Sequence, residues 1–497
     1  MVALILMVCL IATLIAFVLH RLTFWSRQNV PNELASLYNR FQKPFHVADH
    51  ESARRFGDVV GIYEGLTPCL MIKDLDLVKK VLVEDFWNFP NHRRFYVDGQ
   101  LASKSLVSLE DYKWKRMRQI LSPVFSPAKL KSMKESCHQC VETLISNLSE
   151  LTVNREQAAV VDVRKYFGSF AVDLICSVVF GIEINSLKDP DNEIVQQIQR
   201  FFGDSLSGKQ LLLLSFPSLM QLFDLYLLDY EVLKFLNRLT KSILVHRREE
   251  QTSGKSHRKD FIKLLMEAKG TDDRQLNEEE IADQIILFFV AGYDTSVASL
   301  SSVCFCLATH QSVQQQLFLE VQQFLRKTRA SGDEGLMDGA SELRYLDAVI
   351  KESMRFLPVV PRIERRCNKE CYLRSGERSI RIPKDAMVII PIYSLNHDER
   401  YFSQPERFDP QRFLDAEQEE RLAPAYLPFA IGPRACIGQR FALMELKACL
   451  LQVVARFHFD VCPETGSQLD YFCGNPVSTT KQVVLKVRRR DASDARE

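Results

Sequence analysis

The sequence predicts a mainly α-helical protein with a small β-rich region and one N-terminal transmembrane helix. Three observations support this fold class: residues 2–19 are apolar and uncharged, residues 276–309 carry a long helical pattern, and strand patterns are few and short. The chain has 497 residues, of which 46% are hydrophobic and 26% charged, so a large core can form. A net charge of +1 without a block of like charges argues against nucleic-acid binding.

The N-terminal segment is the first predicted element. Residues 2–19, VALILMVCLIATLIAFVL, are long enough to span a membrane, and Arg21, Trp25 and Arg27 follow, as expected at an interface on the cytoplasmic side. A cleaved signal peptide is the alternative. It would need a basic segment before the apolar run and a small-residue cleavage site, and neither is evident. We therefore expect an uncleaved membrane anchor.

Strand patterns occur at three places in the rest of the chain. Residues 58–74 read as a hairpin, residues 378–393 as strands interrupted by Pro383, and residues 481–488 as a late strand. The other patterns are mostly helical, and no repeat or low-complexity segment divides the chain. One predominantly helical domain is therefore expected after the anchor.

The strongest helical pattern covers residues 276–309. Asn277 and Glu280 fit a capping box at its start, and from Ile285 onward the pattern is apolar nearly all round. Such a segment is either a buried core helix or a second membrane span. Asp294 at its centre would cost roughly 2.5–3.5 kcal/mol in a membrane, so we expect a core helix.

Within this helix, residues 291–295 read AGYDT and place an acid beside a hydroxyl in an apolar wall. Gly292 leaves room for another group to approach the backbone. Asp294 and Thr295 could simply satisfy each other or a neighbouring carbonyl. An acid in the middle of a buried helix is nevertheless a candidate functional group.

Two further patterns join charged side chains. Glu352 and Arg355 lie three residues apart on the predicted helix 343–356, and Arg412 lies in the proline-bounded segment QPERFDPQRF, where a buried carboxylate partner would be useful. Most such pairs are surface ion pairs of little energetic value. Trp114 and Arg118 are four residues apart on a basic helix and form either a surface cation–π pair or a donor pair for an anionic ligand.

The thirteen cysteines are odd in number and irregularly spaced, which favours a reducing compartment over a disulfide framework. Cys137 and Cys140 form a CxxC pair within a helical pattern, and we interpret them as packed or surface thiols. Another segment, RIERRC at residues 362–367, offers guanidinium groups beside the apolar stretch FLPVVP.

Cys436 stands in a different setting, FAIGPRACIGQR, between two glycines and two arginines. A strong helical pattern begins just after it, so a helix N-terminus and the two arginines should lower the thiol pKa. Gly432 and Gly438 allow the backbone to lie flat against a bulky planar group. A cysteine nucleophile would need a histidine base, but the nearest histidine that precedes it, His397, reads as structural. The segment therefore favours a metal-ligating thiolate.

The decamer FAIGPRACIG matches the haem-binding loop Phe-x-x-Gly-x-Arg-x-Cys-x-Gly of the cytochrome P450 superfamily at every fixed position. The segments AGYDT, KESMR, WKRMR and FDPQRF resemble the family's other motifs and occur in the family's order. The resemblance spans about residues 57–488, with an anchor typical of microsomal members. It is closest to the clan of the liver drug-oxidising enzymes and thromboxane synthase. It implies the cytochrome P450 fold, a helix-rich haem domain with a small β-rich region.

The resemblance implies roles for individual residues. Cys436 resembles the axial ligand of the iron of haem b, and Phe429 would shield its sulfur. Four side chains match positions that hold the haem propionates: Trp114, Arg118, Arg365 and Arg434. Asp294 and Thr295 resemble the acid–alcohol pair that delivers protons, with Ala291 and Gly292 making room beside them. The buried structural triad of the family corresponds to Glu352, Arg355 and Arg412.

The resemblance also implies a function, a haem-thiolate monooxygenase that inserts one atom of O2 into a lipophilic small molecule. Electrons would come from NADPH through NADPH–cytochrome P450 reductase, docked in part on Lys113, Lys115 and Arg116, with cytochrome b5 as a second expected partner. The protein would lie in the endoplasmic reticulum membrane and face the cytosol. Two alternatives stay open: a peroxide isomerase or lyase that needs no reductase, and a non-catalytic haem sensor or carrier. The Asp294–Thr295 pair favours oxygen activation over the first.

Other expectations concern the substrate and the membrane. Four segments should line the substrate cavity: residues 99–108, the wall around Val290 and Ala291, residues 357–363 and residues 474–478. The apolar run at 211–223 either enters a bilayer or packs between helices. Unlike most microsomal members, the chain has no proline- and glycine-rich hinge after the anchor. The expected division is a membrane anchor (1–20), a linker and entry segment (21–56), a haem-binding catalytic domain (57–490) and an exposed tail (491–497).

Overall fold

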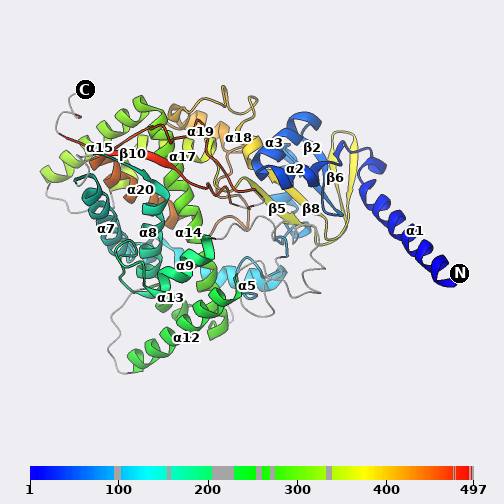
Figure 1. Cartoon of the computed structure of the whole chain (residues 1–497), viewed down its shortest axis with the longest axis horizontal. Coiled ribbons are helices and arrows are strands. Elements are labelled where there is room, and N and C mark those ends of the chain that lie inside the picture. Colours follow the sequence, from blue (N-terminus) through cyan, green and yellow to red (C-terminus); the bar gives the residue numbers. More distant parts are fainter. Residues whose placement is uncertain are drawn as a thin grey trace.

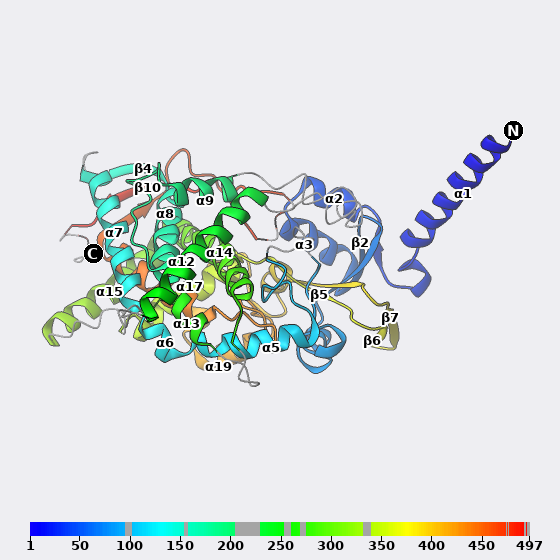
Figure 2. The ribbon, with the colours of Figure 1, turned by 90° about the horizontal axis from the view of Figure 1, so that it is seen from below.

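The main sheet and the long helices occupy opposite ends of the molecule, and helix α1 (Val2–Leu22) projects from the end that holds the sheet (Figure 1, Figure 2). The computed structural model describes residues 1–94, 102–153, 158–203, 229–252, 260–268, 275–331, 339–473, 475, 477–491 and 494. The predicted membrane-entering run 211–223 lies outside these residues, as do parts of the predicted cavity segments 99–108 and 474–478.

Helices dominate the described residues, as the sequence predicts. They are α1, α2 (Ser36–Gln42), α3 (Phe45–Phe56), α4 (Leu75–Lys79), α5 (Asp111–Leu121), α6 (Pro127–Lys131), α7 (Lys134–Val153), α8 (Val163–Ile175), α9 (Glu193–Gly203), α12 (Tyr230–Thr252), α13 (Phe261–Glu267), α14 (Glu278–Thr309), α15 (Gln311–Ser331), α17 (Arg344–Phe356), α18 (Ile392–Asn396), α19 (Ala416–Leu422) and α20 (Gln439–Arg456).

The strands form three sheets. They are β1 (Asn32–Glu33), β2 (Val59–Glu64), β3 (Thr67–Ile72), β4 (Ala158–Asp162), β5 (Arg362–Arg366), β6 (Cys371–Ser375), β7 (Arg378–Ile382), β8 (Met387–Pro391), β9 (Phe457–Asp460) and β10 (Val484–Arg489). The main sheet has the order β1-β2-β3-β8-β5, the second has β4-β10-β9, and β6 pairs with β7.

All three predicted strand regions are confirmed. The hairpin joins β2 to β3, with Glu64 opposite Thr67 and Gly65 in the turn at a φ of +63°, a value that glycine adopts at no steric cost. Strand β7 ends directly before Pro383, because proline cannot donate to a ladder, and β8 begins after the turn. The late strand is β10, which pairs with both β4 and β9. Strands β1, β4, β5, β6 and β9 were not predicted; β4, for example, forms its ladder with β10, far away in the sequence.

Helix α14 is the predicted core helix. Asn277 and Glu280 form the expected capping box, and residues 296–308 are buried without interruption. The helix packs against α8, α12 and α20 in the main hydrophobic core. The expectation of a buried helix rather than a second membrane span is therefore confirmed. Helix α1, by contrast, has no buried residue and a mean hydropathy of 3.2, so it remains the candidate membrane span.

Trp25 corrects one expectation. The sequence places it at the membrane interface, but its side chain is 0% exposed and its indole Nε1 donates to the Ile62 carbonyl at 3.3 Å. A Cβ on Gly61 would lie only 2.2 Å from Trp25 Cγ, so this glycine leaves the space that the indole occupies on strand β2. The segment after α1 therefore docks on the sheet, where a large apolar ring loses more water contact than at an interface.

Candidate active site

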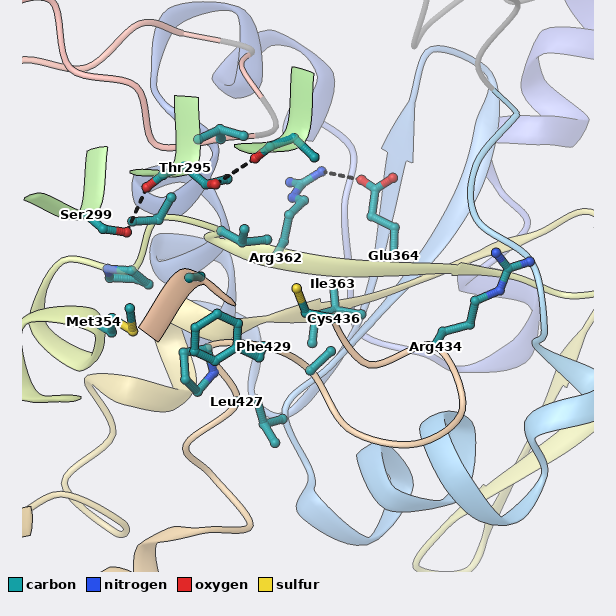
Figure 3. A pocket seen from close by; sticks show the side chains of 18 of the residues that line it. Thr295, Ser299, Met354, Arg362, Ile363, Glu364, Leu427, Phe429, Arg434 and Cys436 are labelled. Atoms are coloured by element: carbon teal, nitrogen blue, oxygen red, sulfur yellow. Dashed lines mark hydrogen bonds and ion pairs between the residues drawn. The ribbon is translucent and has the colours of Figure 1, made fainter. Parts of the chain in front are cut away.

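A cavity of about 520 Å³ lies between the middle of α14, the connection from α17 into β5, and the loop that precedes α20. Figure 3 shows its lining, with Thr295 and Ser299 of α14 on one side and Cys436 with Phe429 on another. Most of the lining is apolar. The aliphatic part consists of Val107, Ala291, Met354, Val359, Val360, Ile363, Leu446 and Val477. The predicted wall and the segment 357–363 both supply lining residues.

The loop from Phe429 to Gly438 places the Cys436 thiol in this cavity. The Cys436 amide donates to the Phe429 carbonyl at 2.9 Å and so closes the loop, and the sulfur points into the cavity beside the Phe429 ring (Figure 3). Gly432 has a φ of +79°, and a Cβ there would lie 2.1 Å from the Leu82 carbonyl oxygen. Gly432 is therefore required where the loop packs against its neighbour. At Gly438, the residue before α20, an added Cβ would meet nothing within 4 Å.

Two opposing effects act on the Cys436 thiol. Burial raises its pKa, while backbone N–H groups of Gly438 and Gln439 and the Arg118 guanidinium act in the opposite direction. The sequence correctly identifies the helix N-terminus as a source of donors. The lowered pKa that it predicts is not reached in the chain alone, because the apolar cavity disfavours the thiolate more than these groups favour it.

Arg434 is buried at the far end of the same loop, as Figure 3 shows. Its guanidinium donates to the carbonyls of Pro90 at 2.8 Å, Leu106 at 3.0 Å and Leu109 at 2.8 Å. The ring of Trp114 lies below it, with 4.3 Å between the guanidinium carbon and the ring centroid. Burial, and after it the neighbouring cations Arg365 and Arg118, lower the pKa of Arg434 to about 9. Trp114 thus supports Arg434 and does not itself line the cavity.

Arg365 enters the cavity from strand β5. Its Nη1 donates to the Glu364 carbonyl at 2.8 Å, its Nε is buried without a hydrogen-bond partner, and burial lowers its pKa to about 10. Within the described part of the chain, no carboxylate forms an ion pair with Arg365 or Arg434. Two buried cations without an anion, beside a thiol in the same cavity, fit a bulky group that carries carboxylates and a thiophilic metal.

The other arginines of RIERRC have carboxylate partners. Arg362 donates to Asp49 at 2.7 and 2.8 Å, and also to Glu64 at 2.8 Å. Arg366 lies within 2.5 Å of Glu110 and donates to Asp385. Because Arg362 and Arg366 are neutralised in this way, only Arg365 has positive charge available for a ligand. The sequence did not reveal this difference, since Asp49, Glu64, Glu110 and Asp385 lie in other segments and Glu364, 3.2 Å from Arg362, is the one partner within RIERRC among the described residues.

The residues of the AGYDT segment lie on two different faces of helix α14. Ala291 and Thr295 line the cavity, and the Thr295 hydroxyl donates to the Ala291 carbonyl at 2.6 Å. Asp294 instead accepts a hydrogen bond from the Thr479 hydroxyl at 2.6 Å, and burial raises its pKa. An added Cβ on Gly292 would lie 3.5 Å from Ile175 Cδ1, so that position faces α8. Asp294 and Gly292 are not among the residues that line the cavity.

Two polar groups at the cavity were missed by sequence reasoning. Glu445 of α20 is buried, accepts a hydrogen bond from the Ser296 hydroxyl of α14, and has its pKa raised by burial to about 8. An acid inside the apolar helical pattern FALMELKACLL was the available signal. His92, half-buried, also lines the cavity, where desolvation and then Arg365 and Arg434 hold its pKa well below its usual value. Nothing in the local sequence indicated His92.

Glu352, Arg355 and Arg412 are brought together beneath the site. Arg355 donates to both Glu352 oxygens at 2.7 and 2.9 Å, and Arg412 Nε lies 3.4 Å from the same carboxylate. The side chains of Glu352 and Arg355 are 0% exposed. Arg355 also donates to the carbonyls of Asn396 and Arg407, so the cluster ties α17 to the chain that leads to the Cys436 loop.

The basic face of α5 is only partly free. Lys113 and Lys115 are exposed, and the Lys115 ammonium lies 5.6 Å from the centre of the Trp87 ring. Arg116 forms an ion pair with Glu280 at 3.0 Å. Elsewhere, Cys137 and Cys140 of α7 are both buried, and burial raises the pKa of each thiol, in agreement with the interpretation as packed thiols. Across the described ranges no cluster of three potential metal-ligating side chains occurs.

Comparison with known proteins finds similar sequences along most of the chain. The family model described as cytochrome P450 matches residues 30–486. Cytochrome P450 3A5 of Homo sapiens is 35% identical over 454 residues, which cover 90% of this chain and 87% of the relative. Cytochrome P450 3A7 of Homo sapiens is 34% identical, with 91% and 88% covered. Cytochrome P450 3A14 of Cavia porcellus is 32% identical, also with 91% and 88% covered.

Proposed function

Since the chain belongs to the cytochrome P450 family, we propose that it inserts one atom of O2 into a lipophilic small molecule of the xenobiotic, steroid or fatty-acid-like kind. Membership makes it an oxidoreductase of the monooxygenase type with a haem-iron cofactor. The cofactor is haem b, and electrons come from NADPH through NADPH–cytochrome P450 reductase, with cytochrome b5 as a second donor. The single observation that supports this function best is the Cys436 thiol in one cavity with two buried arginines that no described carboxylate neutralises.

Bound haem supplies the redox-active iron at which O2 is activated. Cys436 would hold this iron through its thiolate, which the N–H groups of Gly438 and Gln439 would stabilise. Arg365, through its unpartnered Nε, and Arg434, anchored to three backbone carbonyls, would hold the propionates. Trp114 and Arg118 act behind them, because the indole supports Arg434 and the second guanidinium adds positive charge near the thiolate.

Residues of helix α14 deliver protons in this proposal. Thr295 presents its hydroxyl at the cavity wall, where the hydrogen bond to Ala291 fixes its orientation. Asp294 is the acid one residue away; burial raises its pKa, and a hydrogen bond from Thr479 connects it to the C-terminal turn. The apolar lining binds the lipophilic substrate and excludes water from the reaction. Lys113 and Lys115, the exposed cations of α5, receive the acidic reductase.

Helix α1 places the enzyme on a membrane. Residues 2–19 carry no charge, no residue of the helix is buried, and the hydropathy suits an uncleaved span in the endoplasmic reticulum, with the catalytic domain on the cytosolic side. The docked Trp25 takes the place of a flexible hinge, since it fixes the chain to strand β2 a few residues after the span. The expected division at residues 1–20, 21–56, 57–490 and 491–497 is part of this proposal.

The reduced, carbon monoxide-bound absorption spectrum tests the haem site. The wild-type protein should give a far red-shifted Soret band, and Cys436→Ser should lose or displace it while it keeps the same circular dichroism. A wild-type spectrum typical of histidine-ligated haem would refute thiolate ligation.

Turnover with reductase, NADPH and ¹⁸O2, using a steroid, a fatty acid and a xenobiotic, tests the reaction. One labelled oxygen atom in a product is expected. An unlabelled product formed from a hydroperoxide without NADPH would indicate an isomerase or lyase, and haem without any turnover would indicate a sensor or carrier.

A further inference from the structure

The turn between strands β5 and β6 carries two cysteines whose sulfur atoms face each other. Cys367 follows β5 and Cys371 begins β6, and their Sγ atoms are 3.8 Å apart. Three residues separate them, so the two side chains close the turn on one side. Cys367 is buried, and its sulfur lies 2.9 Å from the Lys369 carbonyl oxygen across the turn. Cys371 is only half-buried.

We propose that Cys367 and Cys371 form a reversible disulfide when the protein meets a hydroperoxide. The sulfurs are in van der Waals contact, and bond formation requires them to approach from 3.8 Å to about 2.05 Å, a shift that side-chain rotation and a small movement of the turn can supply. The loop that the bond closes is very short, so the bond adds little to stability and is readily reduced again. These are properties of a regulatory disulfide rather than a structural one.

The two cysteines have different roles in the reaction. Cys371 is the accessible sulfur, and the hydrogen bond from Cys367 lowers its pKa, which favours the nucleophilic thiolate. Its sulfur attacks one peroxide oxygen, the O–O bond breaks, and a sulfenic acid and one water are produced. The Cys367 sulfur then attacks the Cys371 sulfur and expels the hydroxyl as a second water. Two thiols and one hydrogen peroxide therefore give one disulfide and two waters.

This turn is connected to the cavity by a chain of hydrogen bonds. Asn368, between the two cysteines, donates from its side chain to Asp111 at 3.1 Å, and Asp111 also accepts from the Asn91 side chain at 3.1 Å. The Asn91 side-chain oxygen Oδ1 in turn accepts from the Asp111 backbone amide at 3.0 Å and from Arg434 at 3.4 Å. Closure of the disulfide therefore acts on the junction that holds Arg434 and the start of α5. The thiol pair is a peroxide-sensitive site next to, but chemically separate from, the cavity.

Peptide mapping tests the disulfide directly. The full-length protein is treated with increasing hydrogen peroxide, free thiols are blocked with iodoacetamide after denaturation, and the chain is digested with trypsin. Cleavage after Arg366, Lys369 and Arg374 separates the two cysteines, so the disulfide joins peptide 367–369 to peptide 370–374. The linked species, lighter by two hydrogens than the two reduced peptides together, should increase with peroxide and disappear with dithiothreitol. Separate peptides, with both cysteines alkylated or with Cys371 over-oxidised alone, would overturn the proposal.

Matched variants make the result specific. Cys371→Ser should leave Cys367 alkylated at every peroxide concentration, whereas Cys367→Ser should leave Cys371 as a sulfenic acid that dimedone labels. Cys304 and Cys306, two residues apart but fully buried, serve as an internal control and should stay alkylated. The mapping needs no turnover, and the Cys436→Ser protein should give the same disulfide, so its outcome is independent of the proposed function.

Hydrogen–deuterium exchange tests the link to the cavity. Oxidised protein should differ from reduced protein over residues 88–94 and 109–114, and the Cys371→Ser protein should show no change with peroxide. Identical exchange over both segments, in a sample shown to contain the disulfide, would refute the coupling to the Arg434 junction.

Discussion

Replacement of Arg355 by methionine should destabilise the fold severely without changing the cavity lining. The Arg355 side chain is 0% exposed and makes two hydrogen bonds to Glu352 and one each to the carbonyls of Asn396 and Arg407. In R355M the Glu352 carboxylate stays buried with only the Asp409 amide and a long contact to Arg412. Removal of one partner of a buried pair costs about 3–5 kcal/mol because the other charge is left uncompensated.

An exposed pair of the same length provides the control. Arg381 donates to Glu370 at 2.7 Å, as Arg355 does to Glu352, but the two side chains are 49% and 46% exposed. R381M should therefore change stability by less than about 1 kcal/mol. Urea unfolding of both variants, followed by circular dichroism of the detergent-solubilised chain, measures the difference. A factor of ten in the unfolding equilibrium corresponds to about 1.4 kcal/mol, so R355M should unfold at least a hundredfold more readily.

A double mutant separates the charge effect from lost packing. E352Q in the R355M background removes the buried charge, so the double variant should be more stable than the sum of the two single effects predicts. R355M within about 1 kcal/mol of R381M would refute the reasoning. So would strictly additive single effects, since they would mean that Glu352 and Arg355 do not interact energetically.

Three further predictions concern separate parts of the molecule. Gly432→Ala should cost about 1–3 kcal/mol through its left-handed φ and its contact with Leu82, whereas Gly438→Ala should keep wild-type urea stability but lower haem content, measured by absorbance. Trp25→Ala should cost about 3–5 kcal/mol in the same unfolding assay, because it empties a fully buried site on β2. Burial raises the pKa of Glu445 from its ordinary value of 4.5 to about 8 in the folded chain, so the unfolded state loses its proton first as pH rises. The free energy of unfolding should therefore fall between about pH 4.5 and 8 in the wild type, and urea titrations of Glu445→Gln should lack this decline.

The parts of the site that the sequence predicted are those written into short segments. The Cys436 loop lies within ten residues, and the capping box of α14 lies within four, so the spacing alone specifies the geometry. Thr295 and Ala291 also reach the cavity as expected, because residues four apart lie on one face of a helix. By the same periodicity, Asp294 and Gly292 turn toward other neighbours, which the resemblance to known motifs does not indicate.

The parts that the sequence did not predict depend on partners far away in the chain. Trp25 is buried only because a glycine of strand β2, Gly61, lies opposite it. Asp294 accepts a hydrogen bond from Thr479, which lies 185 residues later in the chain. Arg362 and Arg365 look alike in RIERRC, yet Arg362 is neutralised by the distant Asp49 and Glu64 together with Glu364, whereas Arg365 has no carboxylate partner in the described part of the chain. The burial of these side chains and their pairing with distant partners depend on the assembled fold, so the local sequence pattern does not predict them.

Arg434 shows how the assembled fold makes the site. Its hydrogen-bond acceptors lie 325 to 344 residues upstream, so the guanidinium can be held only after α5 and the segment before it have docked on the Cys436 loop. Backbone carbonyls replace its hydration shell, but they supply no negative charge, and the lowered pKa values of Arg434 and Arg365 show that the cost of burial persists. A ligand that carries two carboxylates removes this cost in the folded state alone. Haem binding should therefore stabilise the chain, since a ligand that binds only the folded state shifts the unfolding equilibrium by mass action.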